Sequence, residues 1–307
     1  MGVFVSIKPF KNLDNDASNS LESKIMQLKK RIGNTPLQLV DRVYGNPIYA
    51  KLEYYNPLSY SVKDRAAVYM VSGAIERGEV DPSADLVWIE ASSGNLGIAY
   101  GQVCNHLGLK SMIVVPSVVG DAAFKRVRSS ASECEITPDG YCPRGERDGA
   151  IRRVYDLWSK GSKYVWRDQY SSSDNIRAHY ETTGPEIWRQ TDGKLTTLVS
   201  ATGTGGTIIG SSSYLKETSL EIEALAVQAQ VGHHIQGVRN FEESMKPIIV
   251  KDNEDLIDEW VEVGDEEAFE ATEYLWRVGY PVGTSSGLNY AASRKIARKR
   301  RNALIVT

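Results

Sequence analysis

Short apolar runs alternate along the chain with segments whose apolar residues follow a helical spacing. The apolar runs predict strands over five ranges, which are Ile48–Leu52, Leu86–Glu90, Ser111–Val115, Thr196–Ser200 and Glu223–Val227. The helical spacing predicts helices over Ser23–Arg31, Lys63–Arg77, Gly97–Gly108 and Ile208–Lys216. Such alternation is typical of βαβ units, in which helices join parallel strands. We therefore predict an α/β protein with mainly parallel sheets flanked by helices, and its 307 residues suffice for two lobes.

Two turn-rich or polar stretches interrupt this alternation. Residues 1–23 are rich in Asn, Asp and Ser and lack the apolar core of a signal peptide, so we expect a peripheral arm. Residues 140–149 contain Cys142-Pro143-Arg144-Gly145, a turn-rich sequence that suits a junction between lobes.

Composition and charge argue against two kinds of partner. The 36 basic and 39 acidic residues give a net charge of −3, which favours neither nucleic acid nor a membrane surface. No apolar run approaches the length of a membrane-spanning helix. The basic run from Arg294 to Arg301 is interrupted by Ile296 and Ala297, so we interpret it as a solvated helix face.

The histidines and cysteines form no metal-binding pattern. His233 and His234 have no carboxylate or cysteine at ligand spacing, and we predict no metal site. The three cysteines, Cys104, Cys134 and Cys142, also lack metal spacing and cannot all pair. This usage is typical of a reduced, cytoplasmic protein.

Lys63 stands where a helix is predicted to begin, after the turn Asn56-Pro57 and a serine-rich approach. The free N–H groups of a first helical turn carry positive potential, which disfavours a protonated ammonium. A neutral amine can attack a carbonyl group and bind it covalently. An ordinary solvated lysine also suits a first helical turn, so Lys63 by itself leaves both interpretations open.

The stretch from Glu90 to Gly97 joins a predicted strand to a predicted helix. Its small residues offer backbone N–H groups and polar side chains to an anion such as a carboxylate, and they are Ser92, Ser93, Gly94 and Asn95. An ordinary helix cap is an equally good interpretation of this stretch alone.

A glycine-rich loop follows the predicted strand Thr196–Ser200 and opens another helix, with the members Gly203, Thr204, Gly205, Gly206 and Thr207. Glycine lets the backbone approach a phosphate closely, and threonine hydroxyls add donors. The loop has neither the Gly-Lys-Ser/Thr of a nucleotide-binding loop nor the spaced dinucleotide fingerprint, so it predicts a compact phosphate site. Ser285 lies in a third polar turn, Gly283–Gly287, before a helix. A phosphate site, a carboxylate site, a hydroxyl and an amine together suit pyridoxal phosphate.

These residues resemble the cysteine synthase family, the β-replacement branch of the fold-type II pyridoxal-phosphate enzymes. The resemblance covers nearly all of residues 23–307 and rests on motifs at Ile32–Leu37, Asn56-Pro57, Ser61–Arg65, Ser92–Asn95, Thr182–Ile187, Gly203–Thr207 and Ser285–Gly287. It implies the tryptophan synthase β-like fold, with a large cofactor-binding domain of residues 1–46 and 161–307. It also implies a small mobile substrate domain of residues 47–160, and a homodimer.

The resemblance implies a role for each of these residues. Lys63 would attach pyridoxal phosphate through its amine and later move the substrate α-proton, while Gly203–Thr207 would hold the cofactor phosphate. Ser285 would face the pyridine nitrogen, and Asn95 would hydrogen-bond the cofactor's 3′ oxygen. The residues implied to bind the substrate carboxylate are Ser92, Ser93, Gly94, Asn95 and Gln169. The implied reaction displaces an oxygen leaving group from an activated serine and adds sulfide to give cysteine.

The chain departs from the family pattern at several positions. Leu96 stands where the substrate loop usually has threonine, so one hydroxyl is missing. Ala226–Ala229 lack the customary Glu-Pro, and relatives usually continue beyond Thr307 through an Asp-Ser-Gly loop. Arg239, followed by Asn240, resembles the branch in which an arginine binds the phosphate of O-phosphoserine. A guanidinium can bind a phosphate through two hydrogen bonds, whereas an acetyl ester offers it no full charge.

We therefore favour O-phosphoserine as the donor substrate and sulfide as the nucleophile. If Arg239 is an ordinary surface residue, O-acetylserine is the donor instead. Leu96 also leaves open a different β-replacement that forms cystathionine or a diamino acid. A non-catalytic paralogue is a further alternative, against which the joint presence of Lys63, Asn95, the glycine loop and Ser285 argues.

Overall fold

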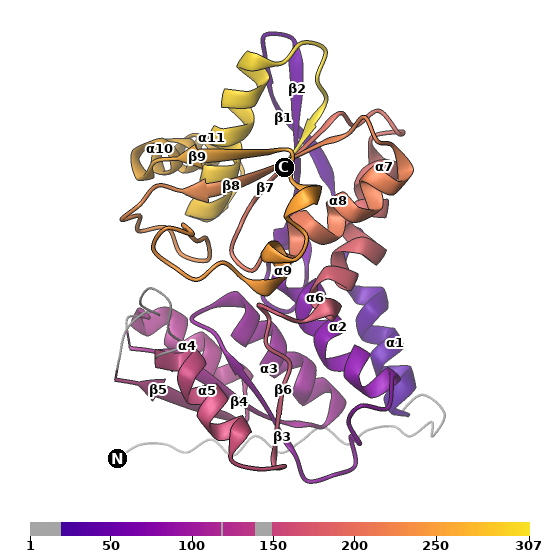
Figure 1. Cartoon of the computed structure of the whole chain (residues 1–307), viewed down its shortest axis with the longest axis vertical. Coiled ribbons are helices and arrows are strands. Elements are labelled where there is room, and N and C mark those ends of the chain that lie inside the picture. The colour runs from indigo at the N-terminus through magenta and orange to yellow at the C-terminus, as the bar shows by residue number, and fades with distance from the viewer. Residues whose placement is uncertain (1–19, 118, 139–148) are drawn as a thin grey trace.

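The computed structural model describes residues 20–117, 119–138 and 149–307. Two lobes lie one above the other in Figure 1, and each is built around one sheet with helices on both faces. This arrangement confirms the predicted α/β architecture with mainly parallel sheets.

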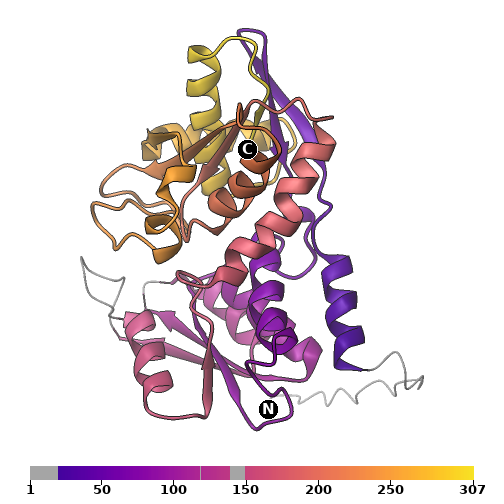
Figure 2. The same ribbon diagram turned by 45° about the vertical axis from the view of Figure 1, so that its right-hand side comes forward.

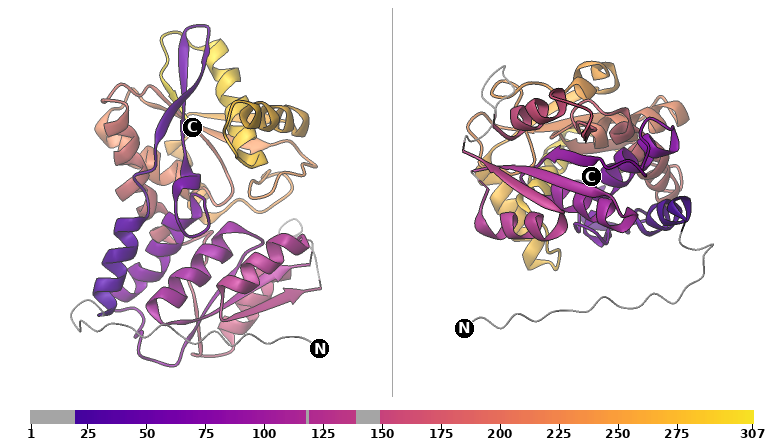
Figure 3. Two further views of the ribbon diagram at one scale, coloured as in Figure 1. Left: turned by 180° about the vertical axis from the view of Figure 1, so that it is seen from behind. Right: turned by 90° about the horizontal axis from the view of Figure 1, so that it is seen from below.

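The lower lobe contains, among the described residues, four parallel strands in the order β5-β4-β3-β6. Their bounds are β3 Val87–Ala91, β4 Lys110–Pro116, β5 Glu133–Thr137 and β6 Tyr164–Trp166. All residues of β3 are buried, as expected for a parallel strand that is covered on both faces. Four helices lie on one face of this sheet and a fifth lies on the other (Figure 3). Their apolar side chains pack against the sheet in two separate clusters. The four are α1 Leu21–Arg31, α2 Lys63–Glu76, α3 Asn95–Leu107 and α4 Asp121–Ser130, and the fifth is α5 Gly149–Ser159.

In the described part of the upper lobe, six strands form a sheet in the order β1-β2-β10-β7-β8-β9. Their bounds are β1 Leu37–Val43, β2 Asn46–Lys51, β7 Thr197–Ala201, β8 Glu223–Ala229, β9 Glu259–Val263 and β10 Ile305–Val306. The first two strands form an antiparallel hairpin, and the other neighbours pair in parallel. Four helices that cover this sheet are α8 Gly206–Thr218, α9 Ile248–Lys251, α10 Asp265–Arg277 and α11 Thr284–Lys299.

One helical segment links the two lobes. Helices α6 (Ser173–Ala178), η3 (His179–Thr183) and α7 (Gly184–Gln190) follow one another without a break, and Figure 2 shows them running from the lower lobe to the upper. The middle part is a π-helical turn, a feature frequently found at functional sites. Two short 3-10 turns, η2 Glu53–Tyr55 and η4 Glu254–Leu256, complete the described helical elements.

The strands and helices predicted from the sequence are confirmed, with boundaries that differ by at most about two residues. The helix predicted to end at Gly108 ends there because Gly108 adopts the left-handed conformation, with φ at +77°. The basic run is a helix face as predicted, since Ile296 and Ala297 are buried. Within this run, the Lys295 amine lies 2.6 Å from the Glu267 carboxylate.

The two sheets divide the chain at positions other than the predicted domain boundaries. The strand β2 pairs with β1 and β10, so residues 46–51 belong to the upper sheet rather than to a domain that starts at residue 47. Conversely, β6 pairs with β3 in the lower sheet although it lies beyond residue 160. Strand pairing between distant segments, rather than chain order, sets these boundaries. The predicted junction at residues 140–149 lies outside the described residues, except for Gly149 at the start of α5.

No helix in residues 20–117, 119–138 or 149–307 is long and apolar enough to cross a membrane. The same ranges hold no group of three or more His, Cys, Asp or Glu residues placed to bind a metal ion.

Candidate active site

Lys63 is the first residue of α2, as the sequence predicts. The carboxylate of Asp64 accepts hydrogen bonds from the backbone N–H groups of Leu58 and Ser59, at 2.6 and 2.8 Å, and so ties the preceding loop to the helix. Burial, and secondly the positive charge of Arg239, lowers the pKa of the Lys63 amine to about 8. A substantial fraction of this amine is therefore neutral near physiological pH, as a nucleophilic lysine requires.

A buried network of charges fixes the start of α2 to the rest of the chain. The Arg65 guanidinium donates two hydrogen bonds of 2.7 Å to the Glu53 carboxylate. It donates two more, of 2.7 and 2.8 Å, to the carboxylate of Glu186 on α7. The Lys51 amine lies 2.6 Å from Glu186, so two cations face two carboxylates. Because the Arg65 side chain is 0% exposed, this network leaves little freedom in the position of the neighbouring Lys63.

The stretch Ser92–Asn95 joins β3 to α3 at the edge of the lower sheet. The Ser92 hydroxyl accepts hydrogen bonds from the N–H groups of Gly97, at 2.9 Å, and Gly94, at 3.3 Å. The side-chain amide of Gln169 donates to the carbonyl of Ala91 at 2.9 Å, which places Gln169 beside this loop. The loop and Gln169 therefore meet at the carboxyl end of β3, where open parallel sheets bind ligands.

The glycine loop leaves β7 and leads directly into α8, as the sequence predicts. An added Cβ would overlap the Gly237 carbonyl at Gly203, Val250 at Gly205 and the Asn175 carboxamide at Gly206. Gly205 also has φ at +88°, a left-handed conformation that favours glycine. The cap residue Gly205 offers α8 no side-chain acceptor, and the N–H of Gly206 donates only a long hydrogen bond of 3.4 Å to the Thr204 hydroxyl.

Two residues on the linking helix support this loop, and the sequence analysis missed them. The Asn175 amide donates to the Thr204 hydroxyl at 3.0 Å and to the Gln169 carbonyl at 2.8 Å. His179 lies 3.3 Å from the Thr207 hydroxyl through Nε2, and 2.8 Å from the hydroxyl of Thr183 through Nδ1. Burial lowers the pKa of His179 to about 3, so the ring is neutral. The spacing of four residues from Asn175 to His179 to Thr183 is the sequence signal that indicates one helix face.

Arg239 is held by an aromatic ring. Its guanidinium carbon lies 4.5 Å from the ring centre of Tyr170, and its Nη2 donates to the Tyr170 hydroxyl at 2.8 Å. Its backbone N–H donates to the carbonyl of Thr202 at 2.9 Å, immediately before the glycine loop. The stacked geometry keeps the cation in a defined place. Ser285 lies in the first turn of α11, whose start no side chain caps.

These segments enclose one cavity of about 560 Å³ between the lobes. The site residues predicted from the sequence that line it are Lys63, Ser92, Ser93, Gly94, Asn95, Gln169, Gly203, Thr204, Gly205, Thr207, Arg239 and Ser285. Gly206 is the exception, and it lies in the same loop where α8 begins. The cavity is also lined by Tyr170 and by Arg126 of α4, which the sequence analysis did not predict.

Comparison with known proteins agrees with this arrangement. The family model described as "Pyridoxal-phosphate dependent enzyme" matches residues 28–307. The chain belongs to this family of pyridoxal-phosphate-dependent enzymes. It is 36% identical to cysteine synthase B of Salmonella typhimurium over 283 residues, which cover 91% of this chain and 90% of that protein. It is 37% identical to cysteine synthase of Aquifex aeolicus over 291 residues, covering 91% and 86% of the two chains. The crystal structure of an O-acetylserine-dependent cystathionine β-synthase from Helicobacter pylori matches with a TM-score of 0.80 at 28% identity, and the match covers 91% of this chain and 93% of the other.

The protein is therefore an enzyme of the cysteine synthase type that depends on pyridoxal phosphate, as its sequence predicts. The glycine loop fits the phosphate of this cofactor, because only residues without a side chain fit its close approaches at Gly203, Gly205 and Gly206. The uncapped start of α8 supplies N–H groups toward an anion. Lys63 lines the same cavity and can reach a carbonyl group that is bound there.

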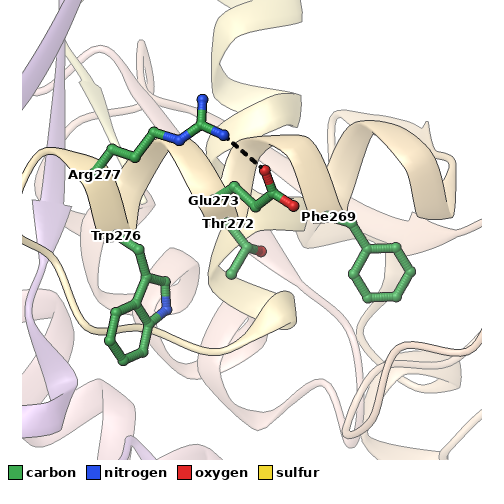
Figure 4. A pocket seen from close by; sticks show the side chains of 5 residues that line it. All are labelled: Phe269, Thr272, Glu273, Trp276 and Arg277. Carbon is green, nitrogen blue, oxygen red and sulfur yellow. Dashed lines mark hydrogen bonds and ion pairs between the residues drawn. The ribbon is translucent and has the colours of Figure 1, made fainter.

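A second, open hollow runs along α10 on the upper lobe (Figure 4). Its volume is about 500 Å³, and it is lined by Phe269, Thr272, Glu273, Trp276 and Arg277. The Arg277 guanidinium donates to the Glu273 carboxylate at 3.1 Å, so the charges in this hollow neutralise each other. None of its lining residues lines the cavity that contains Lys63.

Proposed function

We propose that the protein is a cysteine synthase that replaces the phosphate group of O-phosphoserine by sulfide. The observation that supports this donor is the place of Arg239. The guanidinium is stacked on Tyr170, lines the cavity of Lys63 and lies near enough for its charge to lower the pKa of the Lys63 amine. A fixed positive charge in this cavity favours a donor that carries a second anionic group in addition to its carboxylate.

The choice between the two donors follows from charge. A phosphate ester presents up to two negative charges and several acceptor oxygens to a guanidinium, so that two hydrogen bonds form at once. An acetyl ester presents one neutral carbonyl oxygen in the same place. With the acetyl ester, Arg239 keeps its stacking on Tyr170 but gains no charged partner.

The residues of the cavity divide between cofactor and substrate in this proposal. Lys63 holds pyridoxal phosphate through its amine, Gly203–Thr207 bind the cofactor phosphate, and Ser285 faces the ring nitrogen. Asn95 hydrogen-bonds the 3′ oxygen of the cofactor. When bound, the cofactor supplies an electron sink that stabilises negative charge at the substrate α-carbon. Because Ser285 is a neutral partner rather than a carboxylate, it does not hold the ring nitrogen protonated.

The protein residues then bind and orient the substrate, and Lys63 moves a proton. Ser92, Ser93 and Gln169 bind the substrate carboxylate at the carboxyl end of β3, and Lys63 Nζ takes the α-proton. The bond between the β-carbon and oxygen breaks, and phosphate leaves with the electron pair. Hydrosulfide forms the bond between sulfur and the β-carbon, and Lys63 returns a proton to the α-carbon.

The test compares kcat/KM for O-phosphoserine and O-acetylserine, with sulfide as the second substrate, in the wild type and in Arg239→Ala. Loss of charged hydrogen bonds worth about 2–3 kcal/mol should lower kcat/KM for O-phosphoserine by roughly 30- to 150-fold. The value for O-acetylserine should change by less than about threefold, because the arginine makes no charged contact with that substrate.

The matched control is Arg277→Ala, which removes an exposed arginine of α10 that pairs only with Glu273 among the described residues. This variant should leave both values unchanged. If Arg239→Ala lowers both values equally, or if the wild type prefers O-acetylserine, the phosphate-binding role of Arg239 is wrong.

A second candidate is a β-replacement in which an amino acid rather than sulfide is the nucleophile. Arg126 of α4 lines the cavity from the lobe opposite to Arg239. Leu96 is also buried where the family usually has a hydroxyl. A guanidinium can bind the carboxylate of an incoming amino acid. Product analysis with sulfide, homocysteine and amine-bearing amino acids separates the two candidates.

A further inference from the structure

Tyr60 has a backbone conformation that is unusual for its residue type. Its φ is +57°, in the left-handed region, where a Cβ atom crowds the neighbouring carbonyl oxygen. Six described residues other than glycine have a positive φ, and four of them are asparagine or aspartate, which tolerate it. The other two are Tyr44 and Tyr60, and of this pair only Tyr60 lines the cavity that contains Lys63. Strain at a bulky residue beside an active site suggests that the residue has a function there.

Hydrogen bonds on both sides of Tyr60 impose this conformation. The backbone N–H of Ser59 donates to the Asp64 carboxylate at 2.8 Å, and the Ser59 hydroxyl donates to the same carboxylate. The hydroxyls of Ser59 and Ser61 lie 2.8 Å apart, and Ser61 Oγ accepts from the N–H of Lys63 at 3.1 Å. The chain therefore cannot relax at Tyr60 without breaking hydrogen bonds that also place the start of α2.

The side chain of Tyr60 contributes little to the stability of the fold. Tyr60 is 65% exposed, and its side chain makes no hydrogen bond or ring contact with the residues that the structure describes. Tyr170, which lines the same cavity, is by contrast fixed by its contacts with Arg239. An exposed ring gains little from packing, so the stability of the fold does not account for the strain at Tyr60.

The loop that carries Tyr60 is attached to the same helix as the proposed carboxylate site. The Gln102 amide of α3 donates to the carbonyl of Leu58 at 3.0 Å, and the Ser92–Asn95 loop leads into the start of α3. Because Tyr60 is both exposed and part of the cavity lining, it borders the cavity where this opens to solvent. A substrate whose amine reaches Lys63 and whose carboxylate reaches Ser92–Asn95 lies between the two segments that α3 holds.

We propose that Tyr60 is a substrate-binding residue whose ring covers the bound amino acid at the mouth of the cavity, and that the strained loop holds the ring there. Contact between the ring and the aliphatic part of the substrate removes apolar surface of both from water. This inference rests on the proposed placement of the substrate at Lys63 and Ser92–Asn95. It does not depend on the role of Arg239, because the covered part is common to O-phosphoserine and O-acetylserine.

The experiment measures binding of L-alanine to the holoenzyme, followed by the change in cofactor absorbance. This ligand has the α-amine and α-carboxylate but no leaving group, so the result does not depend on the identity of the donor. Tyr60→Gly should raise the dissociation constant at least about fivefold, because the apolar contact with the ring is lost. Tyr60→Phe keeps the ring and should bind L-alanine within about twofold of the wild type.

Steady-state kinetics distinguishes this proposal from the role proposed for Arg239. In Tyr60→Gly, KM should rise by a similar factor for O-phosphoserine and O-acetylserine, while kcat changes less, because the ring acts on binding. Arg239→Ala should instead affect only the phosphate donor. A failure of either proposal therefore leaves the test of the other intact.

Thermal unfolding of the holoenzyme without amino acid separates binding from a structural role. Glycine adopts a positive φ without strain, so Tyr60→Gly should have a Tm no more than about 2 °C below that of the wild type. The matched control is Tyr44→Gly, since Tyr44 is 82% exposed and has φ at +49° but does not line the cavity. It should tolerate glycine equally well and bind L-alanine as the wild type does.

Three outcomes would overturn the proposal. If Tyr60→Gly binds L-alanine as tightly as the wild type, the ring does not cover the substrate. If Tyr60→Phe binds as weakly as Tyr60→Gly, the hydroxyl rather than the ring is required. If Tyr60→Gly lowers Tm by more than about 5 °C while Tyr44→Gly does not, Tyr60 is a structural residue.

A third variant separates loss of the ring from added flexibility of the loop. Asparagine tolerates a positive φ and keeps a Cβ atom but has no aromatic ring. Tyr60→Asn should therefore weaken L-alanine binding as much as Tyr60→Gly does. Binding by Tyr60→Asn as tight as that of the wild type would also overturn the proposal.

Discussion

Replacement of Glu186 by glutamine removes one of the two carboxylates that neutralise the buried Arg65 and Lys51. The Glu186 side chain is 7% exposed and the Arg65 side chain 0%, so water cannot replace the lost charge. Desolvation by burial opposes ionisation of the Glu186 carboxyl group. The hydrogen bonds and charge of Arg65, together with the charge of Lys51, outweigh this desolvation and lower the pKa of Glu186 from 4.5 to about 2. At about 1.4 kcal/mol per pKa unit, this corresponds to roughly 3 kcal/mol of stabilisation. Removing one partner of a buried ion pair typically costs about 3–5 kcal/mol, and this range includes the roughly 3 kcal/mol obtained from the pKa of Glu186.

The assay is thermal and urea unfolding of the cofactor-free protein, so that ligand binding does not add to its stability. We expect Glu186→Gln to lose about 3 kcal/mol in the free energy of unfolding at pH 7, or roughly 6 °C in Tm for a chain of this length. Glu217→Gln is the matched control, because Glu217 is exposed and accepts one hydrogen bond from the Tyr180 hydroxyl. Its effect should stay within about 0.5 kcal/mol.

The dependence on pH gives the sharper test. The folded-state pKa of Glu186 lies below its ordinary value, so its stabilisation is fully present above about pH 4.5 and is lost as the pH falls toward about 2. The difference between the wild type and Glu186→Gln should therefore be constant between about pH 6 and 8 and shrink below about pH 4. A loss under about 1 kcal/mol at pH 7, or a difference that does not shrink in acid, would refute the reasoning.

Two further predictions concern the cofactor site. Gly206→Ala places a methyl group against the Asn175 carboxamide. We expect the affinity of the cofactor-free protein for pyridoxal phosphate, measured by fluorescence titration, to fall at least about tenfold. An unchanged affinity would mean that this loop does not hold the phosphate. The rate of uptake of pyridoxal phosphate by Lys63 should rise with a midpoint near pH 8, and Arg239→Ala should move that midpoint upward because a neighbouring positive charge is lost. Stopped-flow absorbance checks this, and a midpoint above about pH 10, the ordinary range of a lysine, would contradict it.

Local sequence patterns located most of the elements that carry the chemistry. The turn at Asn56-Pro57 and the helix that begins at Lys63 follow from backbone preferences that act within a few residues. The glycine loop between β7 and α8 was predictable for the same reason, since its conformation excludes side chains. The hairpin strand β1 was missed, because its burial pattern alternates irregularly and gives no clear strand period.

The supports of the site were not predictable, because their partners are far apart in the sequence. Arg239 meets Tyr170 across 69 positions, and Gln169 meets Ala91 across 78. Asn175 and His179 carried a weak signal in their helical spacing, but nothing local indicated that they face the glycine loop. Such pairs are decided by which surfaces bury against each other.

The sequence by itself therefore determined the α/β class, the lysine at a helix start and the loops able to bind a phosphate and a carboxylate, since each depends on local backbone geometry and on the period of burial. The tertiary structure decided the rest: β10 entered the sheet between β2 and β7, and the two lobes brought their loops around one cavity. It also buried Arg65 between two carboxylates. Those outcomes depend on strand pairing and charge neutralisation between distant segments, which only the folded chain brings together.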